Sequence, residues 1–185
     1  MNAVETLLQR NSIATLTGPE ITSEQLETMI RAGLRAADHG WLKPSRFIAV
    51  QGDQRKELGQ VFLNCTEGWQ EMAEDQQIKI MNLPMRAPLI IIAVNASKDH
   101  PKIPKIEQLH STAASTQNII NAAWALGLGA IWRTGDPAHN PLVAEAIGLA
   151  DNEQIVGFVY VGHKNQNPKP LPELDISQYL TELNL

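Results

Sequence analysis

The sequence has little of several features that mark particular classes of protein. It contains one cysteine, Cys65, among 185 residues, which excludes an internal disulfide framework and a cysteine-rich zinc site. Its uninterrupted apolar runs, such as residues 88–94, are far shorter than the roughly 20 residues of a membrane span. The first residues contain no basic segment followed by an apolar run. We therefore expect no secretory signal, no membrane partner and a cytoplasmic location.

The sequence also lacks an excess of positive charge and several well-known catalytic motifs. Lys and Arg together number 15 against 20 Asp and Glu, a net charge of −5, whereas a surface that binds nucleic acid is usually basic. The chain has no H-E-x-x-H pair, no P-loop and no G-x-S-x-G elbow. Gly127-Leu128-Gly129 is not a dinucleotide fingerprint, because Trp132 occupies the place of the third glycine. We expect neither a nucleic-acid partner nor a metal site.

What is present is an ordinary globular composition, 43% apolar and 19% charged. The length favours a single domain over residues 1–185, whose core buries about 70% of the unfolded chain's surface. The spacing of apolar residues predicts helices over 2–9, 23–37, 54–69, 70–83, 105–126 and 141–148. It predicts strands over 47–50, 89–94, 130–133 and 155–161. This mixture indicates an α+β or α/β fold.

Two segments carry more specific expectations. Helix 105–126 has apolar residues that can form its buried face: Ile106, Leu109, Ala113, Ile120, Ala123 and Trp124. After His163, three prolines prevent a regular helix. Residues 163–185 are therefore expected to form an extended C-terminal arm with a short element near 176–183.

Arginines stand at the ends of predicted elements, each beside a hydroxyl residue or a histidine. The pairs are Arg10 with Ser12, Arg35 with His39, and Arg133 with Thr134. The planar guanidinium group makes paired, charge-assisted hydrogen bonds to phosphate. It can also serve as an ordinary surface group or neutralise a helix C-terminus. The residues alone therefore allow two interpretations, a site for a phosphorylated ligand or a set of surface arginines.

Five segments, taken in order, resemble signatures of the nitroreductase family. They are residues 7–12, 30–39, 85–92, 118–135 and 151–162, and their order is most similar to that of the minimal, YdjA-like subgroup. The resemblance implies an α+β fold with a central, mostly antiparallel or mixed sheet flanked by helices. It also implies a homodimer with two FMN sites at the subunit interface.

The resemblance further implies which residues bind the cofactor. Arg10, Ser12 and Arg133 would hold the phosphate and ribityl side of FMN, and Trp132 and Thr134 would frame the site. Asn11, between Arg10 and Ser12, is also counted among the cofactor-binding residues. Arg35 and His39 would reach the same cofactor from the partner subunit.

Other residues would lie near the flavin ring and the electron donor. Trp41 and Leu42 would approach the ring, and Ala122 to Gly127 would contact the pyridine nucleotide. The C-terminal arm would lie across the partner subunit.

The implied activity is that of an FMN-dependent NAD(P)H oxidoreductase. NADPH or NADH would deliver a hydride to flavin N5 and leave, and a nitroaromatic, quinone or related acceptor would then take two electrons in a ping-pong sequence. Three departures from the family pattern leave an alternative open: Asn11 replaces an arginine, Ala14 replaces a cation near flavin N1, and Lys43-Pro44-Ser45 replaces Gln-Pro-Trp. The alternative is a flavin-binding protein without nitroreductase activity, which stores or senses FMN or serves a dedicated redox partner.

Overall fold

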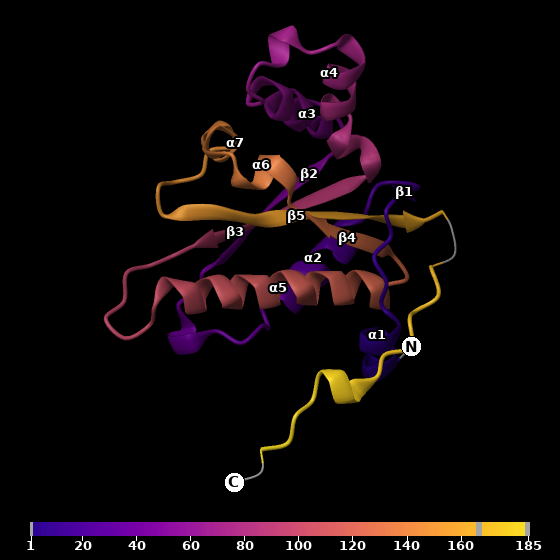
Figure 1. The fold of residues 1–185 in the computed structure, drawn as a ribbon, viewed down its shortest axis with the longest axis vertical. Helices are drawn as coiled ribbons and strands as arrows, with labels where there is room; N and C mark the ends of the chain where they lie inside the picture. Colours follow the sequence, from indigo (N-terminus) through magenta and orange to yellow (C-terminus); the bar gives the residue numbers. More distant parts are fainter. Residues whose placement is uncertain (1, 166–167, 184–185) are drawn as a thin grey trace.

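The centre of the molecule is one five-stranded antiparallel sheet with helices on both faces (Figure 1). A computed structural model describes residues 2–165 and 168–183. The strands are β1 (Leu16–Thr17), β2 (Ser45–Gln51), β3 (Leu89–Ala96), β4 (Gly129–Arg133) and β5 (Glu153–Lys164). Their order is β1–β5–β3–β2, and β4 also pairs with β5. The predicted α+β class and mostly antiparallel sheet are confirmed.

Seven α-helices lie within the described residues; α2 and α5 pack against one face of the sheet, and α3, α6 and α7 lie on the other face (Figure 1). Their bounds are α1 (Ala3–Gln9), α2 (Ser23–Gly33), α3 (Gln54–Asn64), α4 (Glu74–Met81), α5 (Lys105–Ala125), α6 (Gly135–His139) and α7 (Pro141–Ala146). Short 3₁₀ turns occur at η1 (His39–Trp41), η2 (Trp69–Glu71), η3 (Leu83–Arg86) and η4 (Ile176–Gln178). No helix within the described ranges is both long and apolar enough to cross a bilayer.

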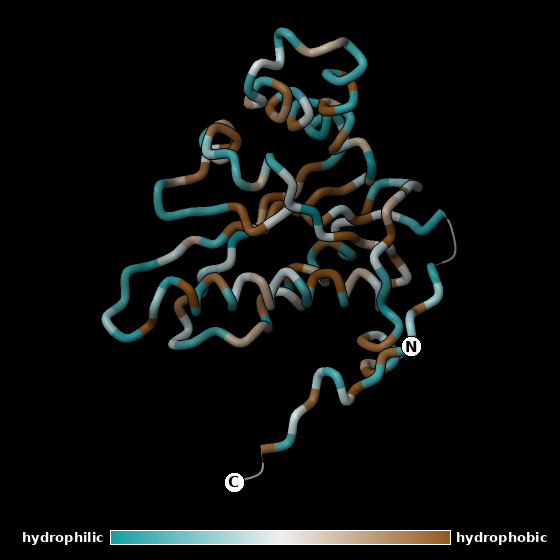
Figure 2. Tube along the Cα trace, in the orientation of Figure 1, coloured by the Kyte–Doolittle hydropathy of each residue, from teal (hydrophilic) through white to brown (hydrophobic). Residues whose placement is uncertain are grey.

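The strand β3 is buried on both faces, as its continuous apolar run predicts. Ile90 and Ile92 pack into the cluster that contains residues of α3 and α7, whereas Leu89 and Ile91 pack into the cluster with α2 and α5. Figure 2 accordingly shows hydrophobic residues concentrated on the strands in the middle of the molecule. Complete burial of such side chains contributes about 1.5–3 kcal/mol each. The sheet is therefore the rigid platform from which the loops extend.

Several helices end earlier in the structure than the sequence predicts. The helix expected over 54–69 ends at Asn64, because the Thr66 hydroxyl donates to the Phe62 carbonyl and Gly68 takes a φ of 67°. The helix expected over 70–83 is only α4, and the one expected to reach residue 37 ends at Gly33. The element expected near 176–183 is reduced to η4. Local polar bonds and glycine conformations end these helices although the apolar spacing continues.

The buried face of α5 is also different from the prediction. Ile106 is 53% exposed, and the buried positions in the first half of the helix are Gln108, Ser111, Thr112, Ser115 and Thr116. These polar side chains can be buried because all of them are hydrogen-bonded: Thr112 and Thr116 donate to carbonyls of α5 itself, and the other three bond to backbone groups of neighbouring segments. Gln108, for example, accepts from the Lys98 N–H at 2.9 Å and donates to the Lys98 carbonyl at 2.8 Å. In the second half, the predicted burial of Ile120, Ala123 and Trp124 is correct.

The C-terminal segment leaves the sheet at the end of β5. This strand continues to Lys164, so the segment begins slightly later than the predicted arm. Residues 168–175 contain neither helix nor strand. Figure 1 shows the segment passing α1 and extending away from the sheet.

Candidate cofactor site

The loop between α2 and β2, residues 34–44, provides the first group of candidate residues. We call it the α2–β2 loop. Together with Ser111 and Ser115 it lines a cavity of about 380 Å³. Arg35, Trp41 and Lys43 lie in the wall of this cavity. The structure thus places Arg35, which the family resemblance assigns to the partner's site, in the wall of a cavity of its own chain.

Serines of α5 fasten the start of the α2–β2 loop. Ser115 donates to the Gly33 carbonyl at 2.5 Å, and Ser111 donates to the Ala37 carbonyl at 2.7 Å. The last carbonyls of a helix have no partner within the helix, and each such bond contributes about 0.5–1.5 kcal/mol net. The polar face of α5 therefore fixes the backbone of the segment that begins at the end of α2.

The middle of the loop has a strained backbone. Trp41 and Lys43 have φ angles of 55° and 49°, which cost about 1–3 kcal/mol each in residues other than glycine. The Lys43 N–H donates to Asp38 at 2.7 Å, and the Lys98 ammonium donates to the Leu42 carbonyl at 2.6 Å. These bonds restrain the backbone around Trp41 and Leu42. Trp41 is 80% exposed, and Leu42 is half-buried. The loop is thus a fixed support that presents an indole ring to solvent.

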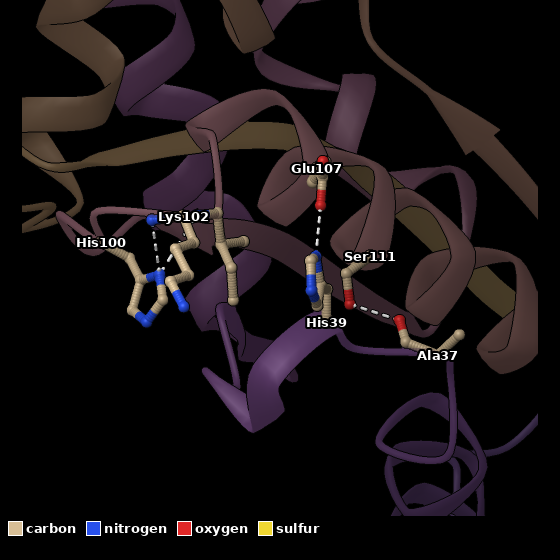
Figure 3. A network of polar contacts seen from close by, with 7 residues as sticks. Ala37, His39, His100, Lys102, Glu107 and Ser111 are labelled. Carbon is tan, nitrogen blue, oxygen red and sulfur yellow. Dashed lines mark hydrogen bonds and ion pairs between the residues drawn. The ribbon is translucent and has the colours of Figure 1, made fainter.

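His39 has a partner in its own chain. Its Nδ1 lies 2.6 Å from Oε2 of Glu107, in the first turn of α5. Figure 3 shows this contact beside the Ser111–Ala37 hydrogen bond, with the His100 ring accepting a backbone N–H from Lys102 at 3.2 Å nearby. His39 therefore lies at the start of α5, whereas Arg35 shares its cavity with Ser111 and Ser115 in the middle of that helix.

A second group of candidate residues lies beside β4. We call Arg10, Ser12, Ala14 and Arg133 the sheet-edge group. Ser12 forms a parallel bridge with Ala130, and a guanidinium N–H of Arg133 donates to the Ala14 carbonyl at 3.3 Å. Arg10 precedes the bridge and Arg133 follows it, so the two arginines extend from opposite ends of this short pairing.

Asn11 joins the backbone of the C-terminal segment to the sheet-edge group through a hydrogen bond. Its side-chain amide donates to the Lys169 carbonyl at 2.7 Å. The sequence gives no local signal for this contact, because 158 positions separate the two residues. Lys169 is therefore a candidate that sequence analysis missed.

A cavity of about 480 Å³ opens beside Arg133. Its lining includes Arg86, Thr134 and Tyr160. The guanidinium carbon of Arg133 lies 5.7 Å from the centre of the Tyr160 ring. Tyr160 is only 4% exposed, and burial raises the pKa of its hydroxyl while Arg133 and Arg86 act to lower it. Arg86 and Tyr160 are also absent from the sequence-predicted site, since only the fold places them opposite Arg133.

Comparison with known proteins decides the family. The model described as "Nitroreductase family" matches residues 7–163. The chain belongs to the nitroreductase family. It is 38% identical over 164 residues to YdjA of Escherichia coli (strain K12), which carries the name NAD(P)H nitroreductase, and the match covers 88% of each chain.

Solved structures have the same fold as this nitroreductase. A nitroreductase-like family protein from Bacillus cereus superposes with a TM-score of 0.84 at 24% identity, covering 99% of this chain and 96% of that one. A nitroreductase from Desulfovibrio desulfuricans, solved in complex with FMN, superposes with a TM-score of 0.77 at 20% identity, covering 100% and 98%.

The arginines of this nitroreductase fall into two classes. Those with structural partners are Arg31, which pairs with Glu27, Arg46, which pairs with Glu153, and Arg55, which donates to the Ala87 carbonyl. By contrast, the side chains of Arg10, Arg35 and Arg86 make no hydrogen bond or ion pair with any residue that the structure describes. The side chains without partners are thus found in or beside the two groups of candidate residues.

Two other predicted site residues have clear structural roles in the nitroreductase fold. The Trp132 indole N–H donates to the Val156 carbonyl at 3.3 Å, and a side chain at Gly157 would collide with the indole. Gly127, with a φ of 80°, ends α5 in a Schellman motif in which the Leu128 N–H donates to the Ala123 carbonyl at 2.9 Å. Ala122 is half-buried on the last turns of α5, and Thr134 is exposed. Ligand contacts of these residues stay predictions.

Cys65 is not placed as a nucleophile. It is half-buried beyond the end of α3, and burial raises the pKa of its thiol, which favours the unreactive protonated form. Among residues 2–165 and 168–183, no three histidine, cysteine or acidic side chains cluster as metal ligands.

The donors of this nitroreductase fit a flat, phosphorylated cofactor. The Nε of Arg133 is buried and has no hydrogen-bond partner among the described residues, although an unpaired buried donor costs about 1–3 kcal/mol. Arg10 and the exposed Ser12 are free to donate to a phosphate group. The cavity beside Arg133 combines Arg86 and Arg133 with the apolar side chains Phe62, Leu83 and Phe158. The residues present are therefore compatible with FMN.

Proposed function

We propose that this nitroreductase binds FMN and transfers two electrons from NADPH or NADH to a small acceptor such as a nitroaromatic compound or a quinone. When bound, FMN would accept a hydride at N5 and then reduce the acceptor, in two separate half-reactions. The name of YdjA and the FMN in the Desulfovibrio desulfuricans structure support this proposal.

The observation that carries the proposal is the set of arginines without partners. A protein with a net charge of −5 has ample carboxylates for pairing, yet Arg10, Arg35 and Arg86 remain unpaired among the described residues. A phosphate monoester carries about −1.5 to −2 charges at pH 7 and accepts several hydrogen bonds. We assign its binding to Arg10 and Ser12, with Lys169 close by.

The proposed site needs two copies of the chain. His39 lies beside the first turn of α5, whereas Figure 1 shows α1 near the end of α5 that leads to β4. From Glu107, which contacts His39, to the end of α5 at Ala125 the helix rises roughly 27 Å, so His39 lies far from the Arg10 of its own chain. A two-fold related copy would bring the Arg35 and His39 of one subunit to the Arg10 of the other.

Exposed apolar side chains support the homodimer. Val4, Leu7 and Leu8 form an apolar stripe on α1 and are 63%, 63% and 71% exposed. Ile176 and Leu180 of the C-terminal segment are 62% and 65% exposed. Apolar surface of this kind marks interaction sites. We assign α1 and the C-terminal segment to the contact with the second subunit.

An absorbance titration tests the proposed function. Purified protein is reconstituted with FMN, freed of excess flavin, and scanned in the visible range before and after anaerobic addition of NADPH or NADH. Retained flavin bands that bleach support an NAD(P)H-dependent enzyme. Bands that persist with both donors support the alternative, a flavin-binding protein with another role. Protein that retains no flavin contradicts the proposal.

Mixing two variants tests the shared site. Arg10→Ala and Arg35→Ala should each bind FMN weakly when expressed alone. After subunit exchange, a mixed dimer contains one site with both arginines intact, so about a quarter of all sites should regain normal affinity. No recovery, with exchange verified by native mass spectrometry, would place the two arginines in the same site of one chain or in no common site.

A further inference from the structure

Glu107 occupies a helix-capping position but cannot cap its own helix. The helices α1 and α2 each begin with a capping box, in which the side chain of the third residue, Glu5 or Gln25, accepts the N–H of the N-cap residue. Glu107 is likewise the third residue of α5, but the N-cap of this helix is Pro104, which has no N–H. The Glu107 carboxylate is therefore free to bond to another segment.

The carboxylate bonds instead to His39 in the α2–β2 loop. Figure 3 shows the two side chains pointing toward each other, with Nδ1 of His39 at 2.6 Å from Oε2 of Glu107. Because a carboxylate only accepts hydrogen bonds, the proton of the neutral imidazole ring must be on Nδ1. Nε2 makes no hydrogen bond to any described residue, and the His39 side chain is 62% exposed. The ring atom that is available to a ligand is therefore Nε2.

The backbone that carries His39 is held by the connection between β3 and α5. Gly40, the next residue, has a φ of 69° and lies so close to the side chain of Ile103 that a Cβ on the glycine would collide with it. Ile103 is itself only 4% exposed. These contacts fix the backbone but not the imidazole ring, whose one hydrogen bond within the described chain is that with Glu107. The orientation of the ring therefore depends on Glu107.

We propose that Glu107 is a positioning residue of the flavin site: it holds the imidazole ring of His39 with the proton on Nδ1, so that Nε2 is presented to the FMN of the second subunit. This inference rests on the proposed function, in which His39 reaches that cofactor. Glu107 acts through His39 and not by contact with the flavin. It fixes one tautomer and one ring orientation before the cofactor binds, which reduces the ordering cost of binding.

Nitrogen NMR of the ¹⁵N-labelled apoprotein tests the position of the proton, because protonated and unprotonated ring nitrogens differ widely in chemical shift. At an alkaline pH that keeps imidazole neutral, His39 should carry its proton on Nδ1. His100 is the internal control with the opposite tautomer, since its Nδ1 accepts the N–H groups of Lys102 and Ile103. In Glu107→Ala the His39 proton should move to Nε2 in a large fraction of molecules. Glu107→Gln, whose amide oxygen still accepts, should keep it on Nδ1.

Flavin affinity tests whether this geometry matters to the ligand. The apoproteins of the wild type, His39→Ala, Glu107→Ala and the double variant are titrated with FMN by fluorescence quenching. Each single variant should weaken FMN binding by at least about threefold, the lower end of the range for one hydrogen bond. The double variant should bind no more weakly than His39→Ala, because Glu107 acts only through His39. Glu107→Gln should retain most of the wild-type affinity.

Riboflavin and a second exposed ion pair complete the experiment. Riboflavin lacks the phosphate, so a loss of affinity for both flavins places Nε2 at the ribityl chain or the ring. A loss for FMN alone places it at the phosphate, to which only the protonated ring can donate. Either result supports the proposal. Glu27→Ala, which breaks the exposed pair with Arg31, should change neither affinity.

Different results overturn different parts of the scheme. A wild-type His39 with its proton on Nε2, or a double variant that binds FMN clearly more weakly than His39→Ala, would overturn the positioning role. So would a Glu107→Gln variant that binds as weakly as Glu107→Ala. If His39→Ala leaves FMN binding unchanged, this inference is wrong and the proposed function stands; if the wild type binds no flavin, both are wrong. The wild-type spectrum and His39→Ala decide the matter if Glu107→Ala does not fold.

Discussion

The α2–β2 loop and the sheet-edge group differ in how their polar atoms are satisfied. The loop has hydrogen bonds along its length, from Ser115, Ser111 and Lys98, and these bonds hold even its left-handed residues. The sheet-edge group instead leaves donors unused, among them the Nε of Arg133. One region is therefore organised by the hydrogen bonds of the fold itself, whereas the other contains donors that the described chain does not use.

The largest expected effect is on the stability of the anchored region. Gln108→Leu should lower the free energy of unfolding by about 2–4 kcal/mol, because the N–H and the carbonyl of Lys98 both lose their partner. Urea unfolding monitored by circular dichroism measures it. Gln117→Leu on the same helix is the matched control, because Gln117 bonds only to Asn121 one turn away and should cost less than about 0.5 kcal/mol. Equal losses in the two variants would contradict the anchoring role of Gln108.

At the sheet edge, the expected effect is on binding and not on stability. Arg10→Ala should weaken FMN binding by about 1.5–3 kcal/mol, the range for hydrogen bonds to charged groups. Its unfolding free energy should change by less than about 0.5 kcal/mol, since Arg10 has no partner among the described residues. Calorimetric titration and urea unfolding check the two parts. A clear loss of stability would mean that Arg10 belongs to the folded framework, as the α5 side chains do.

A smaller loss of stability is expected when one hydrogen bond between α5 and the end of α2 is removed. Ser115→Ala leaves the Gly33 carbonyl without its side-chain donor and should cost about 1–2 kcal/mol. Amide hydrogen exchange should accelerate at Leu34 and Arg35 more than in β3. Ser177→Ala, which removes a hydrogen bond to Asp175 in the exposed C-terminal segment, is the control. Unchanged exchange at Leu34 would show that the rest of α5 suffices to hold the loop.

The smallest effect concerns a paired arginine. Arg46, hydrogen-bonded at 2.6 Å, holds the pKa of Glu153 below its usual value. A carboxyl with a lowered folded-state pKa stabilises the protein above its unfolded-state pKa of about 4.3, and this contribution is lost as the pH falls through the folded-state value. Because the Arg46 side chain is 42% exposed, solvent screening should limit the contribution to about 1 kcal/mol or less. Glu153→Gln should therefore destabilise the protein at pH 7 and have little effect near pH 3, as urea unfolding at both pH values would measure. A loss of equal size at both pH values would contradict an ionic contribution.

Predictions that depend on apolar residues close together in the sequence are confirmed, whereas those that depend on polar contacts between distant segments are not. The buried strand over 89–94 follows from a continuous apolar run, and the C-terminal end of α5 follows from the Gly127 signal. The buried face of the first half of α5 could not be found in the same way. Helical periodicity assigns apolar residues to the inside, but Ser111 and Ser115 are buried because they meet carbonyls of the chain after α2. The partners of a polar side chain are set by segments far away in the sequence.

Some residues of the candidate site can be recognised in the sequence, and others only in the structure. Arg10, Ser12, Arg35 and Arg133 are visible in the sequence, because arginine beside a hydroxyl residue or a histidine at an element end suggests phosphate chemistry. Arg86, Tyr160 and Lys169 are not visible in this way. They approach Arg133 and Asn11 only after β4 pairs with β5 and the C-terminal segment returns to α1.

The buried central strand, the other main strands, the resemblance to nitroreductases and most of the positively charged candidate residues were predictable from the sequence, because these depend on local composition and on order along the chain. Only the tertiary structure decided which arginines are paired and which are left with free donors. It also decided that Arg10 and Arg133 extend from opposite ends of the pairing beside β4. The physical reason is that hydrogen-bond satisfaction is a property of groups brought together from distant parts of the chain, and no local pattern of residues records it.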